Sequence, residues 1–237
     1  AFWFANVILN SKKHPVDFES FYGQTESLMG PHEAGRFWYR WFPQGDQVYV
    51  PPGATSESKL QELRQEILAM SAIAKAPVLS KNTYNSMRIA PIVEAFPEAC
   101  FLVLRRDPLD TAQSILKGRI KFTGHKGQWW ALPPKEIDKI RDHPYWEQVV
   151  EQVYYVYRQI ARDKTQFGME RFYDVEYEKL CKETHDTLKN IESFLRSKGV
   201  ELRPHGAVPE QFHFSTGQKI SQEDYKLIRK KVEELWE

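Results

Sequence analysis

The stretch FLVLRRDPLDTAQSIL, residues 101 to 116, decides the fold class of this chain. It opens with a short apolar run without alternation, which predicts a strand buried on both faces, as in a parallel sheet. Asp107 is suited to cap a following helix, and Pro108 suits the first position of that helix. Arg105 and Arg106 are therefore expected at the carboxyl end of the strand, the edge where open α/β sheets bind ligands.

Ser114 follows Arg106 by eight residues, about two turns into the predicted helix. A phosphate at this edge could take a fork of hydrogen bonds from the Arg106 guanidinium and one more from the Ser114 hydroxyl. The alternative is that Arg106 pairs with Asp107 or Asp110 and that Ser114 is a small packing residue. Periodicity alone leaves both interpretations open.

Strand and helix patterns alternate through the middle of the chain. The helices show apolar residues at helical spacing, whereas the strands are short runs bounded by turn signals. We expect further strands at residues 77–80 and 172–177, and helices near residues 60–74, 91–96, 149–160, 188–195 and 221–236. This alternation predicts an α/β fold with a parallel sheet that is flanked by helices on both faces.

The composition is typical of a soluble globular protein. The 237 residues are 41% hydrophobic and 27% charged, and they predict a single domain over residues 1–237. A net charge of +1 lacks the basic excess of a nucleic-acid binder, so no nucleic-acid partner is expected. No apolar stretch reaches the ~20 residues of a membrane span. Cys100 and Cys181 give no disulfide framework, which favours the cytoplasm.

Arg106, Asp107, Pro108 and Ser114 resemble the second nucleotide motif of the sulfotransferases that use 3′-phosphoadenosine 5′-phosphosulfate (PAPS). In that family a strand ends in Arg, Asp-Pro follows, and a Ser stands eight residues after the Arg. Other stretches are similar to the same family, and in part to its bacterial-type branch, at residues 22–42, 81–89 and 175–180. The resemblance extends over about residues 20 to 197.

The resemblance implies a three-layer, P-loop-kinase-like fold and transfer of a sulfuryl group from PAPS to an acceptor hydroxyl or amine. The product would be 3′-phosphoadenosine 5′-phosphate (PAP), and the acceptor a small molecule or a glycan. Arg106 and Ser114 would hold the 3′-phosphate, with Lys219 of the run STGQK in a basic loop over it. Tyr177 would contact the adenine, with core packing as its alternative. No metal is expected, because the histidines show no ligand spacing.

Three residues are candidates for the catalytic chemistry. Relatives place a catalytic lysine at a strand end like that of Lys81, where it would stabilise charge on the bridging oxygen as the sulfuryl group leaves. His32 and Glu33 are candidates for the base that takes the acceptor's proton, because relatives place this turn beside the acceptor cleft. A solvated surface position is the alternative for each of them.

Trp129 and Trp130 lie in a loop that contains Gly, Lys and Pro. Exposed aromatic side chains near glycine hinges indicate a lid that closes over an acceptor. Docking of both rings onto the domain's own surface is the alternative, and the sequence favours neither.

The family's first motif does not occur upstream of residue 60. That motif is a strand and a Gly- and Ser/Thr-containing loop, which cradles the 5′-phosphosulfate with backbone N–H groups. We expect that the chain begins after this first strand and phosphate loop, so that the domain is N-terminally incomplete. A non-catalytic binding module of the same fold is the alternative function. A P-loop small-molecule kinase is another, although no Gly-x-x-x-x-Gly-Lys pattern occurs.

Overall fold

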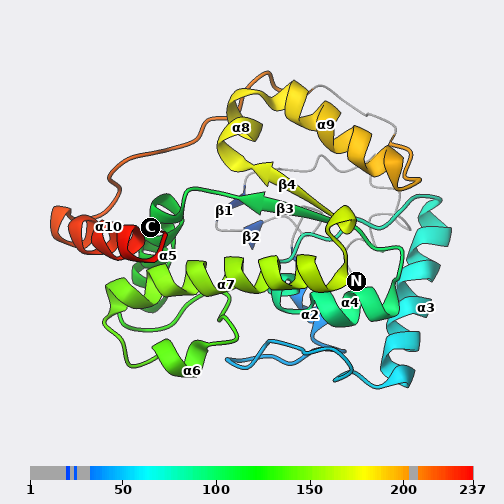
Figure 1. Cartoon of the computed structure of the whole chain (residues 1–237), viewed down its shortest axis with the longest axis horizontal. Coiled ribbons are helices and arrows are strands. Elements are labelled where there is room, and N and C mark those ends of the chain that lie inside the picture. The colour runs from blue at the N-terminus through cyan, green and yellow to red at the C-terminus, as the bar shows by residue number, and fades with distance from the viewer. Residues whose placement is uncertain (1–19, 22–23, 26–32, 203–207, 237) are drawn as a thin grey trace. The chain divides into compact units, whose positions relative to one another are not determined.

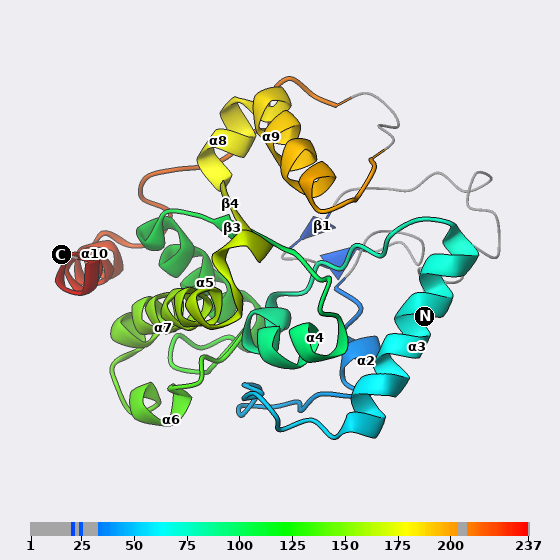
Figure 2. The same cartoon turned by 45° about the vertical axis from the view of Figure 1, so that its right-hand side comes forward.

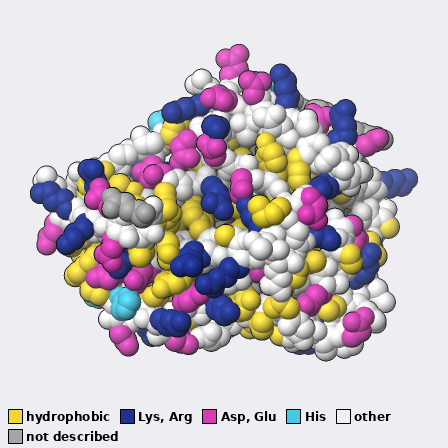
Figure 3. Space-filling model, in the orientation of Figure 1, with side chains coloured by type: hydrophobic (Ala, Val, Ile, Leu, Met, Phe, Trp, Pro, Cys, Tyr) yellow, Lys and Arg dark blue, Asp and Glu magenta, His cyan; other side chains and the backbone are white. Residues whose placement is uncertain are grey.

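The computed structural model describes residues 20–21, 24–25, 33–202 and 208–236 (Figure 1). The chain divides into two compact units, Ala1–Pro97 and Glu98–Glu237. The prediction of one domain over residues 1–237 stays a prediction. Basic and acidic side chains both occur across the face seen in Figure 3, in keeping with the net charge of +1. In the described part of the chain, no helix combines the length and the apolar character that crossing a membrane requires.

The first unit is mainly helical. Trp38, Leu63 and Met87 are buried at its core. Its elements are β1 (Ser20–Phe21) and β2 (Gln24–Thr25), which pair antiparallel, then α2 (Gly35–Trp38), α3 (Glu57–Ala74), η2 (Thr83–Met87) and α4 (Ile89–Ala95). The helix α3 confirms the one predicted at residues 60–74. In α4, Pro91 lies in the first turn, where its missing N–H removes no helical hydrogen bond.

The strand predicted at residues 77–80 does not form. These residues have no regular secondary structure, and Leu79 is 85% exposed. A strand requires a neighbour with which to exchange backbone hydrogen bonds, and the sheets of the described residues include no partner for this run. Ser80 instead accepts a hydrogen bond from the indole N–H of Trp38 at 3.2 Å.

The second unit contains the predicted parallel strand pair. β3 (Phe101–Arg105) runs parallel to β4 (Phe172–Glu176), as the sequence indicated. The prediction that β3 is buried on both faces was wrong. Val103 is buried, whereas Leu102 and Leu104, which share the opposite face, are 37% and 53% exposed. Among the described residues β3 has a single strand neighbour, β4. Its side chains are therefore covered less completely than those of a strand that lies between two others.

Helices flank this strand pair on both sides. The helices of the second unit are α5 (Pro108–Thr123), α6 (Ile137–Ile140), α7 (Tyr145–Phe167), η3 (Met169–Arg171), α8 (Tyr177–Lys182), α9 (Thr184–Ser197) and α10 (Gln222–Trp236). Helices α8 and α9 lie on one side of the strands, and α5 and α7 lie on the other (Figures 1 and 2). This arrangement confirms the α/β class, and the three-layer, P-loop-kinase-like fold stays a prediction.

Helices α5, α7 and α10 pack together through an apolar cluster. Ala112 and Leu116 of α5, Val149 and Val150 of α7 and Ile228 of α10 are fully buried in it. Full burial of a leucine, isoleucine or valine side chain, such as Leu116 or Ile228, contributes roughly 1.5–3 kcal/mol. The cluster therefore fixes the position of α5, the helix that begins at the predicted nucleotide motif.

Two arginines are fully buried without a carboxylate partner among the described residues. Arg119 of α5 donates to the side-chain oxygens of Gln148 at 2.7 Å and Gln152 at 3.3 Å. Arg88 donates to the carbonyl oxygen of Pro43 at 3.0 Å, and three aromatic rings surround its guanidinium. Burial lowers the pKa of each guanidinium to about 10, so both stay charged at neutral pH.

Candidate functional site

The carboxyl ends of β3 and β4 coincide, because Arg105 pairs with Glu176 in the parallel register. The residues that follow, Arg106 and Tyr177, are therefore neighbours. The Arg106 guanidinium lies 4.8 Å from the centroid of the Tyr177 ring, within the range of a cation–π interaction. Burial raises the pKa of Tyr177, so its hydroxyl stays protonated at neutral pH. Tyr177 begins α8, so the predicted strand at 172–177 was one residue too long.

The turn from β3 into α5 is held by several hydrogen bonds. The Asp107 carboxylate accepts the backbone N–H of Asp110 at 2.8 Å, and Pro108 occupies the first helical turn, which confirms the predicted cap. The hydroxyl of Tyr157, on α7, accepts the backbone N–H of Arg106 and donates to its carbonyl, both at 3.1 Å. The backbone of Arg106 is therefore fixed on both sides.

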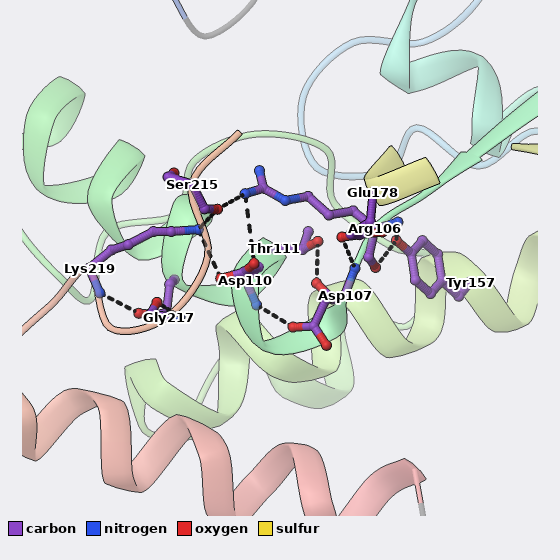
Figure 4. Close-up of polar contacts among 10 residues, drawn as sticks. Arg106, Asp107, Asp110, Thr111, Tyr157, Glu178, Ser215, Gly217 and Lys219 are labelled. Atoms are coloured by element: carbon purple, nitrogen blue, oxygen red, sulfur yellow. Dashed lines mark hydrogen bonds and ion pairs between the residues drawn. The ribbon is translucent and has the colours of Figure 1, made fainter. Parts of the chain in front are cut away.

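Two cations converge at this edge (Figure 4). Arg106 Nη2 donates to the carbonyl oxygen of Ser215 at 3.0 Å, and Lys219 Nζ donates to the same oxygen at 2.6 Å. Both cations also face the buried carboxylate of Asp110, at 4.0 Å from Arg106 and 2.8 Å from Lys219. The pairing of Arg106 with Asp110 that the sequence left open thus exists, together with a second cation.

The segment that carries Lys219 is tied to both α5 and α8. The backbone N–H of Phe212 donates to the carbonyl of Cys181 at 2.9 Å, and the Phe214 ring meets Tyr177 edge-on at 6.3 Å. Gln113 of α5 bonds to two backbone groups of residues 217–219. Because these contacts come from helices on both sides of the strand pair, the segment crosses the carboxyl edge of β3 and β4.

Ser114 lies one helical turn beyond Asp110 and is partly buried. Residues at this spacing share one face of a helix, so Ser114 lies on the side of α5 that carries Asp110. The side chain of Arg106 is 25% exposed and that of Lys219 is 12% exposed. Both cationic side chains are therefore largely buried but still accessible to solvent. The roles of Arg106, Ser114, Tyr177 and Lys219 in nucleotide binding stay predictions.

The first unit brings two of the predicted catalytic residues together. Lys81 Nζ forms an ion pair with the carboxylate of Glu33, and the Thr83 hydroxyl donates to the same carboxylate at 3.3 Å. The side-chain amide of Asn82 fixes the backbone carbonyl of Glu33 at 2.7 Å. His32, the third candidate, lies outside the described residues. Catalytic roles for Lys81, His32 and Glu33 stay predictions.

Trp129 and Trp130 pack onto α5. The guanidinium of Arg119 lies 4.7 Å from the centroid of the Trp129 ring, and Trp130 stacks on Phe122 with ring centroids 5.2 Å apart. The Trp130 ring covers Gly118 so closely that a Cβ there would lie 2.2 Å from it. These contacts agree with the alternative in which both rings dock onto the domain's own surface. Acceptor binding by the two tryptophans stays a prediction.

Sequence reasoning missed one group of possible metal ligands. His143, Glu147 and Glu151 bring one ligand atom each within 4.8 Å of one another. Their spacing of four residues places Glu147 and Glu151 on consecutive turns of α7, with His143 in the bend just before the helix, a signal that a search centred on histidine pairs overlooks. Lys231 lies 3.4 Å from Glu147 and 3.6 Å from Glu151 and neutralises part of their charge. The expectation of no metal stays a prediction.

Sequence reasoning also overlooked Tyr157 and Gln113. No local pattern in the sequence could identify Tyr157, because its hydrogen bond to Arg106 joins residues 51 positions apart. Gln113 had a local signal: it is a polar residue at helical spacing from Leu109 and Leu116, which both belong to the apolar side of α5, and the structure buries it fully. A polar residue on an apolar helix face predicts a buried hydrogen-bond partner.

The comparisons with known proteins agree with the motif at this edge. The family described as the sulfotransferase family matches residues 9–201, a span that contains Arg106, Ser114 and Tyr177 and stops before Lys219. No curated protein and no solved structure gave a significant match. Because the matched residues make up well over half of its length, this chain belongs to the sulfotransferase family.

Proposed function

We propose that this chain transfers a sulfuryl group from PAPS to a hydroxyl or amine of a small-molecule or glycan acceptor, and that PAP is released. Membership of the family supports sulfuryl transfer in general. One observation carries the choice of donor: Arg106 and Lys219 converge on a single carbonyl oxygen at the carboxyl edge of two parallel strands. This is the edge where α/β proteins bind nucleotides.

The charge at this edge suits the 3′-phosphate of the donor. Arg106 and Lys219 supply two positive charges, and Asp110 is their only carboxylate partner among the described residues. The carbonyl of Ser215 currently accepts from both cations, and phosphate oxygens would take over that position with stronger, charge-assisted hydrogen bonds. Ser114 would add a hydroxyl donor from α5. Tyr177, which contacts Arg106 through its ring, would lie against the adenine.

The transfer itself requires a base and stabilisation of the leaving group. The base takes a proton from the acceptor. The oxygen or nitrogen of the acceptor then forms a bond to sulfur, and the bond from sulfur to the bridging phosphate oxygen breaks. We assign stabilisation of that oxygen to Lys81 and proton removal to Glu33 or His32. Glu33 supports this assignment, because hydrogen bonds from Lys81 and Thr83 orient its carboxylate.

Calorimetric titration with PAP and with 5′-AMP tests the donor site. The chain should bind PAP more tightly than 5′-AMP, which lacks the 3′-phosphate. Arg106→Ala should weaken PAP binding about 10- to 100-fold, the usual loss for hydrogen bonds to a charged group, and should leave 5′-AMP binding unchanged.

Arg105→Ala is the matched control. Arg105 is the adjacent residue, and it pairs with Asp174 at 3.1 Å rather than with the segment that carries Lys219. This variant should bind PAP like the unmodified chain. Equal affinity for PAP and 5′-AMP, or equal losses in Arg105→Ala and Arg106→Ala, would refute the assignment of the 3′-phosphate.

A further inference from the structure

Gln113 is a fully buried amide, and both ends of it bond to the segment over the strand edge. Its Nε2 donates to the carbonyl of Gly217 at 3.1 Å, and its Oε1 accepts the backbone N–H of Lys219 at 2.8 Å. The two bonds span three residues, with Gly217 in the left-handed conformation (φ +80°) that favours glycine. A single side chain therefore fixes the backbone turn that leads into Lys219.

We propose that Gln113 is a positioning residue of the nucleotide site, which holds the turn Gly217–Lys219 so that the Lys219 ammonium meets the 3′-phosphate beside Arg106. The inference rests on the proposed function, because it assigns Gln113 to the same phosphate site. Gln113 acts through Lys219 and does not itself contact the nucleotide.

The contacts separate the task of Gln113 from that of Asp110. Asp110 pairs with Lys219 Nζ at 2.8 Å, at the far end of a flexible four-carbon stem. Gln113 holds the backbone of Lys219, where the stem begins. Without Gln113, the turn and the long side chain would have to be ordered again each time the phosphate binds, and that ordering costs conformational entropy.

The amide group is matched to this task. A primary amide offers a donor and an acceptor at adjacent atoms, and the turn presents one carbonyl and one N–H. A glutamate in this position could still accept from Lys219 N–H when ionised, but it would turn an oxygen toward the carbonyl of Gly217. A leucine could do neither. The two substitutions therefore remove one bond and both bonds, respectively, with little change in volume.

Binding of PAP and 5′-AMP by four variants tests the proposal: Gln113→Leu, Gln113→Glu, Lys219→Ala and the double variant Gln113→Leu/Lys219→Ala. Gln113→Leu should weaken PAP binding about tenfold, a typical loss when one charge-assisted phosphate contact is weakened. The double variant should bind PAP within about twofold of Lys219→Ala, because Gln113 works through that lysine. Binding of 5′-AMP should be the same in all of them.

Hydrogen exchange supplies a readout that needs no nucleotide. The Lys219 amide should exchange faster in Gln113→Leu, whereas its protection should be partly kept in Gln113→Glu, which retains the acceptor. Gln113→Glu also keeps the proposal testable if the leucine variant fails to fold, since it should still weaken PAP binding. Unchanged PAP binding in the folded Gln113 variants, or additive losses in the double variant, would overturn the role of Gln113.

The failure of this role is distinguishable from failure of the site. If the unmodified chain binds PAP no better than 5′-AMP, the 3′-phosphate site is refuted, and the role of Gln113 with it. If the unmodified chain discriminates and Lys219→Ala loses that discrimination while Gln113→Leu keeps it, the site stands and only the role of Gln113 falls.

Discussion

Gly118→Ala should destabilise the chain, although the helix propensity of alanine predicts the opposite. Gly118 lies inside α5, where replacing glycine by alanine normally stabilises a helix by about 1 kcal/mol. A Cβ at this position would lie 2.2, 2.5 and 2.7 Å from three atoms of the Trp130 ring, whereas ordinary contacts begin at 3.4 Å. The indole would have to move by about 1 Å, an overpacking that costs roughly 1–3 kcal/mol.

That movement would also disturb the stacking of Trp130 on Phe122, whose rings are inclined by only 12°. Loss of an aromatic pair costs about 0.5–1.5 kcal/mol. The sum of both costs, less the gain in propensity, gives a net loss of about 2 kcal/mol in the free energy of unfolding. Urea denaturation measures it as a lower midpoint at an unchanged slope.

Repeating the substitution in a Trp130→Ala variant shows whether the indole ring of Trp130 causes the loss. In Trp130→Ala the obstacle is gone, so Gly118→Ala should stabilise the chain by about 1 kcal/mol through helix propensity alone. The sign of the substitution therefore reverses between the two backgrounds. Equal effects of Gly118→Ala with and without the indole would refute the packing argument.

Two further predictions concern buried charges. Burial raises the pKa of the Asp163 carboxyl from 3.8 to about 6, so the folded chain binds this proton more tightly than the unfolded chain, and stability falls as the pH rises through that window. Asp163→Asn should therefore stabilise the chain by about 2–3 kcal/mol at pH 8 and hardly at pH 4, as measured by thermal unfolding. The control is Asp186→Asn at an exposed position, which should leave the stability unchanged at both pH values. Arg119→Met should cost about 3 kcal/mol, because it leaves two glutamine oxygens unpaired. Arg88→Met leaves one carbonyl unpaired, and the methionine thioether can still pack against the three rings that surround Arg88, so this variant should cost about 1 kcal/mol in urea denaturation. An equal or larger cost for Arg88→Met would contradict the reasoning.

The sequence predicts best where structure depends on near neighbours. The strand predicted to end at Leu104, the Asp107 cap and Pro108 in the first helical turn all follow from chemistry within a few residues. The cap and the position of Pro108 are confirmed, and the strand forms with its end one residue later, at Arg105. The parallel pairing of β3 with β4 joins distant segments, and it was predicted from the alternation of strands and helices along the chain. The helix α3, in contrast, follows from chemistry within a few residues. Such features depend on backbone preferences that the local sequence carries.

It predicts least well where the outcome depends on what lies beside an element. An apolar run such as residues 101–104 is compatible with burial on both faces, but the exposure of Leu104 depends on which segments cover it. Residues 77–80 have the composition of a strand and lack a partner among the described residues. No local pattern contains that information, since it is a property of the assembled sheet.

The candidate site combines both kinds of information. Arg106 could be placed from its own motif, whereas its contact with Ser215 joins residues 109 positions apart. That long-range contact creates a property that no single motif shows: two cations share one carboxylate and one carbonyl oxygen. A carbonyl dipole compensates a full charge only in part, so one positive charge at this sheltered edge lacks an ionic partner among the described residues. An anion such as a phosphate would remove this imbalance, which is why the convergence of Arg106 and Lys219, more than the motif alone, supports a nucleotide site at the end of β3.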